Sequence, residues 1–110
     1  MQVVLKESDA QEPFSFSFIN AAGKSLLKSE NYKAKKSALS GIESVKQNCI
    51  NDDRYEMKQS KNGKFYFNLK ASNGQVVGTS MMFASEADRD SAIAELKSGG
   101  PGAAVEQSGV

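Results

Sequence analysis

The chain contains an internal repeat, and this repeat constrains its architecture more than any local pattern does. When the sequence is shifted by 51 positions, residues 14–47 align with residues 65–98 without a gap. Aromatic residues fall on aromatic residues, as Phe14 does on Phe65, and glycine falls on glycine. A unit of about 50 residues buries too little apolar surface to be comfortably stable alone. We therefore expect the two units to pack against each other and to share one core.

Each unit shows the pattern of three strands followed by a helix. In the second unit, Asn-Gly pairs at 62–63 and 73–74 separate segments of alternating apolar residues, which is typical of β-hairpins. The spacing of apolar residues predicts helices near 34–48 and 85–97. Ser85, followed three residues later by an acidic residue, is a typical start for the second helix.

These patterns predict an α+β domain over residues 1–97, built from two tandem β-β-β-α repeats, 1–50 and 51–97. Six strands are expected in one antiparallel sheet, with both helices on one face and a pseudo-twofold axis between the repeats. Residues 98–110 are small, glycine-rich and unmatched in the first unit. We expect them to form a flexible C-terminal tail.

The register of the first strand is the one part of the repeat that the sequence leaves open. The offset of 51 places Val4 on Tyr55, whereas the apolar alternation follows Val3 and Leu5. A longer, irregular loop over Ser8–Pro13 would account for this difference of one residue.

Composition indicates a soluble globular protein. Apolar residues make up 39% and charged residues 25% of the chain, which is not typical of a disordered protein. No apolar run approaches the roughly 18–20 residues that cross a bilayer, and the N-terminus lacks the features of a signal peptide. Cys49 is the only cysteine, so no internal disulfide forms. We expect a cytoplasmic location and no membrane contact.

Several segments resemble the YegP-like family of unknown function. The resemblance rests on the turn and strand at 73–77, the helix string at 41–46 and the strand at 60–71, together with Ser80, Phe83 and Ser85. It covers nearly all of residues 2–97, and the departures are Ala22, Ala92 and Leu96. The resemblance implies a small bacterial protein in which a tandem chain forms, as a monomer, the pair that single-unit relatives form as homodimers. It implies no activity, cofactor or catalytic residue.

The residue types give little support for catalysis. The chain has no histidine, which removes the commonest general base and the commonest metal ligand. Cys49 lies on the apolar side of the first helix, where we expect a buried structural thiol rather than a reactive one. The adjacent carboxylates Asp52 and Asp53 lie in the link between the units, where acidic turns are ordinary. We expect no catalytic residue, metal or cofactor, and therefore no enzyme.

A group of lysines is the clearest candidate for a binding site. Lys33, Lys35 and Lys36 stand at the start of the first helix, where the helix dipole disfavours cations by roughly 0.3–1 kcal/mol each. With Lys24 and Lys28 they form a basic patch in the first repeat, which would suit weak binding of an anion or a nucleic acid. The alternatives are a solvated charge run that maintains solubility, or a surface facing the acidic second helix.

Tyr66 is the second candidate. It lies on the side of its strand opposite Phe65 and Phe67, together with Lys64, Asn68 and Lys70. If no helix covers that side, Tyr66 would offer a surface on which a nucleic-acid base can stack. The alternative is a partly exposed tyrosine without a ligand, which is common on antiparallel sheets.

The sequence does not establish a biochemical function. It favours a small, non-enzymatic binding or interaction module, with weak anion or nucleic-acid binding through the basic first repeat as the specific hypothesis. The alternatives are a protein-interaction or structural module without nucleic-acid binding and, more remotely, an enzyme that uses carboxylates alone.

Overall fold

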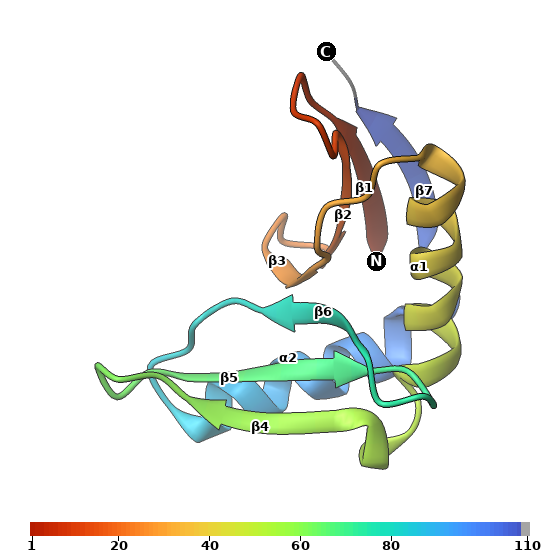
Figure 1. The fold of residues 1–110 in the computed structure, drawn as a ribbon. Helices are drawn as coiled ribbons and strands as arrows, with labels where there is room; N and C mark the ends of the chain where they lie inside the picture. Colours follow the sequence, from red (N-terminus) through yellow and green to blue (C-terminus); the bar gives the residue numbers. More distant parts are fainter. Residues whose placement is uncertain (109–110) are drawn as a thin grey trace.

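The computed structural model describes residues 1–108, which form one mixed β-sheet and two α-helices (Figure 1). The strands are β1 (Gln2–Glu7), β2 (Phe14–Ile19), β3 (Ser25–Lys28), β4 (Tyr55–Gln59), β5 (Phe65–Lys70), β6 (Val76–Ser80) and β7 (Ala104–Ser108). The helices are α1 (Lys35–Asn48), α2 (Glu86–Gly99) and the short 3₁₀ helix η1 (Asp52–Arg54). The α+β class, the single sheet and the two helices are therefore as the sequence predicts.

The two repeats meet in the middle of the sheet. The strand order is β4-β5-β6-β3-β2-β1-β7, so that the meander β1-β2-β3 joins the meander β4-β5-β6 through β3 and β6. At this junction the strands are antiparallel, and Lys28 lies opposite Thr79. The sheet is continuous from one repeat into the other, because the last strands of the two meanders pair with each other.

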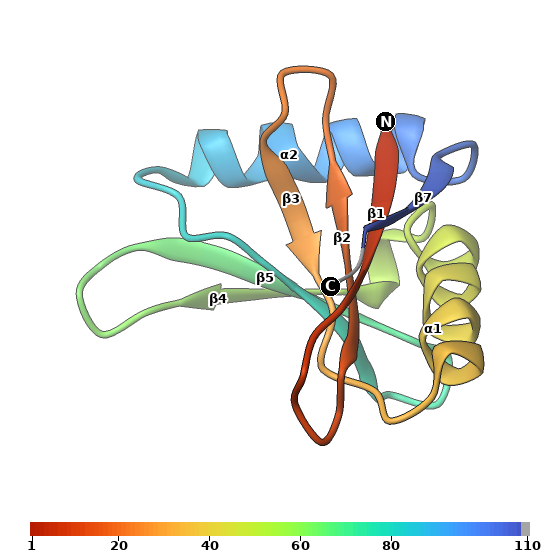
Figure 2. The same ribbon diagram turned by 90° about the horizontal axis from the view of Figure 1, so that it is seen from above.

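A single core lies between the sheet and the helices. Alternate residues of the central strands, such as Phe16 and Phe67, are buried and belong to the same cluster as Ile42 of α1 and Ile93 and Leu96 of α2. Each such side chain contributes about 1.5–3 kcal/mol when it is removed from water. Helix α1 contacts β2 of its own repeat and also β5 and β6 of the other repeat. The core is therefore shared, and Figure 2 shows both helices beside the same twisted sheet.

The first strand follows the alternation of its apolar residues. Leu5 pairs with Phe16, and Met57 pairs with Phe67 in the second repeat, so β1 and β4 correspond at an offset of 52 residues. The remaining residue is taken up by the loop Ser8–Pro13. The prediction of a longer loop at this point is confirmed.

The C-terminal segment differs from the flexible tail predicted over 98–110. Helix α2 continues to Gly99, and Ala104–Ser108 form β7, which pairs in parallel with β1. Ala103 is buried, and the Lys35 ammonium donates a hydrogen bond to Gln107 Oε1 (2.6 Å). The segment is too short and too rich in small residues for its sequence to signal a strand. The sheet thus has seven strands, one pair of them parallel, and residues 109–110 lie outside the described part.

Candidate functional site: the open face of the sheet

The face of the sheet that points away from the core is lined mainly by polar side chains, and we call it the open face. Because side chains alternate along a strand, the neighbours of the buried Phe16 and Phe67 point to this side. Strand register aligns one row of residues across all seven strands: Glu106, Val4, Ser17, Lys28, Thr79, Asn68 and Glu56. Within residues 1–108, the apolar positions of both helices pack into the core on the opposite side.

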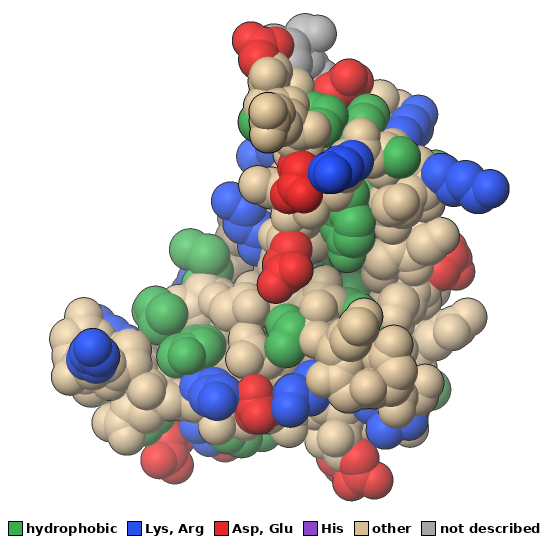
Figure 3. All heavy atoms as spheres, in the orientation of Figure 1, with side chains coloured by type: hydrophobic (Ala, Val, Ile, Leu, Met, Phe, Trp, Pro, Cys, Tyr) green, Lys and Arg blue, Asp and Glu red, His purple; other side chains and the backbone are tan. Residues whose placement is uncertain are grey.

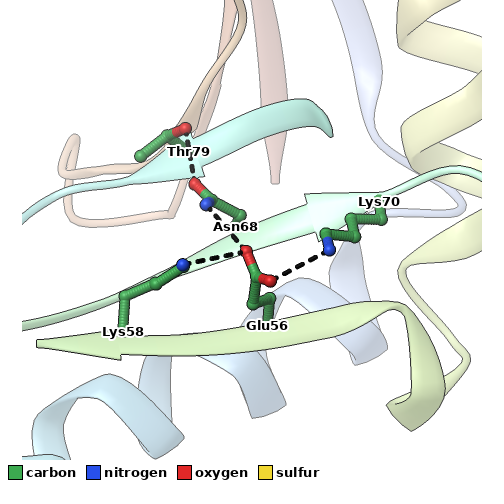
Figure 4. A network of polar contacts seen from close by, with 5 residues as sticks. All are labelled: Glu56, Lys58, Asn68, Lys70 and Thr79. Carbon is green, nitrogen blue, oxygen red and sulfur yellow. Dashed lines mark hydrogen bonds and ion pairs between the residues drawn. The ribbon is translucent and has the colours of Figure 1, made fainter. Parts of the chain in front are cut away.

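One end of this row is a network of polar contacts (Figure 4). The Thr79 hydroxyl donates a hydrogen bond to Asn68 Oδ1 (2.8 Å), and Asn68 Nδ2 donates to Glu56 Oε1 (3.2 Å). Lys70 Nζ donates to Glu56 Oε2 (2.9 Å), and Lys58 Nζ lies 3.6 Å from Glu56 Oε1. Hydrogen bonds from Lys70 and then from Asn68 lower the pKa of Glu56 below its ordinary value. The network fixes these side chains, and its two lysines and one glutamate give it a net charge of +1.

The open face is basic as a whole. Strand register and alternation put four lysines on it against two glutamates: Lys6, Lys28, Lys58 and Lys70 against Glu56 and Glu106. Figure 3 shows an acidic group between two basic ones across β4 and β5, in the arm below the inward bend of the surface. In the described part of the chain, Lys28 forms no ion pair. It borders a hollow of about 220 Å³ that Thr79 and Met81 also line.

Tyr66 lies on the open face. It pairs with Lys58 of β4 and shares its side of β5 with Asn68 and Lys70. The tyrosine is half-buried between its neighbours. Within residues 1–108 the helices pack on the other side of the sheet, and register puts Lys28 on the same face as Tyr66.

The remaining predicted lysines do not form one patch with Lys28. Lys24 precedes β3, about 13 Å from Lys28 along an extended chain, and its ammonium lies 5.6 Å from the centre of the Phe83 ring. Lys35 points to Gln107 on the helix side of β7. The five lysines are thus divided among the open face, the β2–β3 turn and the start of α1.

The start of α1 has the unfavourable charge pattern that the sequence indicates. Its N-cap residue is Ala34, which offers no side-chain hydrogen bond, and its first turn contains no acidic residue. At α2, by contrast, the Ser85 hydroxyl accepts a hydrogen bond from the Asp88 backbone N–H (3.1 Å), as the capping pattern predicts. Lys33 and Lys36 are both exposed.

The other candidates for chemistry have structural partners. Burial raises the pKa of the Cys49 thiol, and the Tyr55 hydroxyl donates a hydrogen bond to the Cys49 carbonyl (2.6 Å). Burial also raises the pKa of Tyr55. Asp52 forms an ion pair with Lys97 of α2. Residues 1–108 bring together no group of three Cys, Asp or Glu side chains suited to a metal ion.

Sequence reasoning missed the network around Glu56. The signal was available, because the alternation of β4 and β5 already puts Glu56, Lys58 and Lys70 on the side of Tyr66. The sequence prediction did not include the register between β4 and β5, which sets Glu56 opposite Asn68. Register within a hairpin depends on the turn, and register between repeats depends on the whole sheet.

The fold and the open face define a class of small α+β proteins in which two repeats share one sheet. The family profile for a domain of unknown function (DUF1508) matches residues 9–56 and again residues 60–107. The chain belongs to this DUF1508 family, with two copies in tandem. Both matches begin in the turn that follows the first strand of a meander, and both continue into the strand after the helix.

Several uncharacterised proteins and two solved structures resemble the chain. It is 48% identical over 102 residues to a UPF0339 protein in the ptx operon 5′ region of Stutzerimonas stutzeri, covering 93% of the chain and 92% of that protein. It is 46% identical over 95 residues to the UPF0339 protein YegP of Escherichia coli K12, covering 86% of the chain and 84% of that protein. The solution structure of a UPF0339 protein from Shewanella oneidensis superposes with a TM-score of 0.91 at 37% identity, over 98% of the chain and 91% of that structure. That of yegP from E. coli superposes with a TM-score of 0.91 at 40% identity, over 98% and 92%.

The comparisons bear out the resemblance to the YegP-like family. The family model and the E. coli structure are both described as of unknown function, so the family assignment supplies a fold and no activity. Neither helix in the described part of the chain has the length and apolar character that a bilayer crossing requires.

Proposed function

We propose that the protein is a non-enzymatic binding module that uses the open face to bind single-stranded nucleic acid. The observation that carries this proposal is the uncovered row of residues across all seven strands, with the unpaired Lys28 near its centre. Four lysines against two glutamates favour a polyanionic ligand, and Tyr66 offers an aromatic ring beside them. An exposed sheet with basic and aromatic side chains is a common platform for single strands.

The proposal places the binding surface differently from the sequence hypothesis. Lys28 and Tyr66 remain in the site, and Lys58 and Lys70 join them. Lys33, Lys35 and Lys36 lie at the start of α1, outside the open face, so we assign them no contact with the ligand. Neutralisation of phosphates would make the affinity fall by about 0.7–0.9 log units per contact for each tenfold rise in salt.

A chemical-shift titration with a mixed single-stranded oligonucleotide tests the proposal. We expect shifts in the amides of β3, β5 and β6, and loss of most of the affinity in a Lys28→Ala/Tyr66→Ala variant. The matched control is the Lys33→Ala/Lys35→Ala/Lys36→Ala variant, which removes more positive charge away from the open face. If the control loses affinity for the oligonucleotide and the Lys28/Tyr66 variant keeps it, the binding site is the start of α1, and the assignment of the site to the open face is rejected. If no amide moves at low salt, nucleic-acid binding is rejected.

A protein partner is the second candidate function, supported by two exposed methionines. Met81 and Met82 follow β6 and are 48% and 54% exposed. Met81 borders the same hollow as Lys28, and methionine is frequent on adaptable protein-binding surfaces. This candidate predicts shifts centred on residues 79–83 with a protein partner, and none with an oligonucleotide.

We further propose that the chain acts as a cytoplasmic monomer with a pseudo-twofold axis through the β3–β6 junction. The facing pair Lys28 and Thr79, which are repeat counterparts, supports the axis. The second repeat occupies the edge of β3, so that this edge is closed within one chain. Cys49, buried and free, supports a reducing compartment. Sedimentation equilibrium at micromolar concentration tests the monomer, and a concentration-independent dimer would reject it.

A further inference from the structure

A second candidate site lies between the turn that joins β2 to β3 and the outer side of α2. It is a hollow of about 260 Å³. Its apolar lining consists of Leu26, Phe83 and Ala92, and its polar lining consists of Asn20, Lys24, Asp88, Ser91 and Glu95. Pockets for drug-sized ligands usually measure roughly 300–1,000 Å³, so this one suits a smaller molecule. It is separate from the open face.

The hollow has opposite charges on its two walls. On the turn, the Lys24 ammonium lies 5.6 Å from the centre of the Phe83 ring. On the helix, Asp88 and Glu95 provide two carboxylates, and Glu95 Oε2 accepts a hydrogen bond from Asn20 Nδ2 (3.2 Å). In the described part of the chain, none of these three charged groups belongs to an ion pair. A cation and two carboxylates therefore border one hollow without neutralising each other by direct contact.

The equivalent junction, between the β5–β6 turn and α1, provides an internal comparison, because different residues occupy the same positions there. At the offset of 51, the apolar lining corresponds to Val77, Tyr32 and Gly41. The Tyr32 hydroxyl occupies the space beside Gly41, only 2.6 Å from where a Cβ would stand, and α1 contacts β6 there. The charged residues correspond to neutral ones: Lys24 to Gln75, Asp88 to Ser37 and Glu95 to Ser44.

The fold therefore forms this turn-to-helix junction once without charge and once with three charged groups. Asp88 has a structural reason, since an acid in the first turn of a helix favours the dipole. Glu95 lies near the other end of α2, where the dipole disfavours an acid, and Lys24 has no counterpart charge at Gln75. The helix dipole therefore does not account for Glu95, and the equivalent junction forms without a charge at the position of Lys24.

We propose that this hollow binds a small zwitterion, namely a free α-amino acid with an apolar side chain. The ligand carboxylate would pair with Lys24, the ligand ammonium with Glu95 and Asp88, and its side chain would contact Leu26 and Phe83. This class follows from the two walls of opposite charge and from the small volume of the hollow. A simple anion would face the two carboxylates, and a simple cation would face Lys24, so each is disfavoured by like charge.

Titration of the full chain with L-leucine, followed by amide chemical shifts, tests the proposal. We expect saturable shifts at residues 20–26 and 83–95. Two analogues serve as matched probes: 4-methylpentanoate, which lacks the ammonium, and 3-methylbutylamine, which lacks the carboxylate. Each is expected to bind at least about tenfold more weakly, because each loses one charge pair.

Variants separate this site from a general surface effect. Glu95→Gln keeps an acceptor for Asn20 but removes the charge, and it should weaken leucine binding by about tenfold. Asp90→Asn changes an acid of α2 that pairs with Arg89 outside the hollow, and it should leave binding unchanged. Absence of shifts up to about 20 mM leucine overturns the proposal, since that limit excludes even millimolar affinity. Equal binding of the amine or the acid, or unchanged binding by the Glu95 variant, overturns it as well.

Discussion

Lys28 and Thr79 lie directly opposite each other across the β3–β6 junction, although 51 residues separate them in the chain. Their facing side chains point to the open face, between Ser17 and Asn68, which are also separated by 51 residues. In an antiparallel pair of equivalent strands, this register is the one that a local twofold axis would produce. The junction therefore places equivalent positions of the two repeats side by side, yet one contributes a cation and the other a hydroxyl.

Two buried serines hold the strands of each repeat together in the same way. Ser29 Oγ accepts a hydrogen bond from the Phe16 N–H (2.9 Å), and Ser80 Oγ accepts one from the Phe67 N–H (2.9 Å). Ser29→Ala and Ser80→Ala should each reduce the free energy of unfolding by about 1–3 kcal/mol, because each leaves a buried N–H without its side-chain acceptor. Urea denaturation measures the loss. The exposed Ser40 provides the control, and a similar loss in Ser40→Ala would argue against this explanation.

Gly41 and Tyr32 should be coupled energetically. A methyl group at Gly41 would meet Tyr32 Oη at 2.6 Å and Phe16 Cε2 at 3.0 Å. Gly41→Ala should therefore destabilise the protein by about 1–3 kcal/mol through overpacking, despite a gain in helix propensity of roughly 1 kcal/mol. In a Tyr32→Phe background, which reproduces the Phe and Ala of the second repeat, most of this cost should disappear.

A double-mutant cycle on unfolding free energies measures this coupling. The expected interaction energy is at least about 0.5 kcal/mol in favour of the double variant, in the range that contacting residues show. Additive effects would mean that the phenolic hydroxyl does not limit the residue at position 41. Gly23→Ala does not serve as a control because its φ of +80° strains any other residue, whereas the exposed Ser40→Ala does.

The sequence predicts the strands and helices that occur in both repeats better than it predicts β7, which follows the second repeat. Alternating Phe14, Phe16 and Phe18 mark β2 because an apolar face at every second residue has one simple structural explanation. Strand β7 has no such pattern: Val105 is 43% exposed, and the strand forms by pairing with an edge that β1 provides. Such pairing depends on which edge remains free after the rest of the sheet has formed.

The candidate site was predictable only in part for a related reason. The outward orientation of Tyr66 follows from alternation within β5 and can be read from the sequence. That of Lys28 cannot, because Leu26 and Leu27 are both buried and the pairing of β3 with β2 is irregular. The presence of Tyr66 and Lys28 on one face depends on the β3–β6 junction, which no local pattern reveals. Lys24 and Lys28, by contrast, are close in sequence, but the extended chain separates them and Lys24 faces Phe83.

The Glu56 carboxylate should titrate below an ordinary glutamate. Hydrogen bonds from Lys70 and Asn68 lower its pKa from 4.5, so the charged form is favoured in the folded state. The stability that this provides is present above the ordinary pKa and is lost as the pH falls below 4.5 and through the lower folded value. Side-chain carboxyl shifts measured by NMR give the pKa directly. In Lys70→Met the pKa should rise toward 4.5, whereas an unchanged pKa would remove Lys70 as the main cause.

The terminal strand should contribute to stability without being essential to the fold. A chain that ends at Gly102 loses the pairing of β7 with β1, the buried Ala103 and the hydrogen bond from Lys35 to Gln107. We expect this truncation to cost on the order of 1–3 kcal/mol, since a few hydrogen bonds contribute about 1 kcal/mol each. Amide exchange should accelerate in β1 and stay slow in β5. A truncated chain that is unfolded, or one that is as stable as the full chain, contradicts this assignment.

The two repeats should not fold when they are separated. Helix α1 contacts β5 and β6 of the second repeat, and the buried residues of both repeats form one cluster. A peptide of residues 1–50 would lose the contacts that β5 and β6 make with α1. A peptide of residues 51–110 would expose to solvent the parts of β5 and β6 that α1 contacts in the intact protein. Each half would also present the unpaired edge of β3 or β6 to solvent, which favours association.

Circular dichroism and sedimentation of each peptide should show an unfolded chain or a homodimer, and an equimolar mixture should recover the spectrum of the intact protein. Two peptides that fold alone as stable monomers would contradict the shared core.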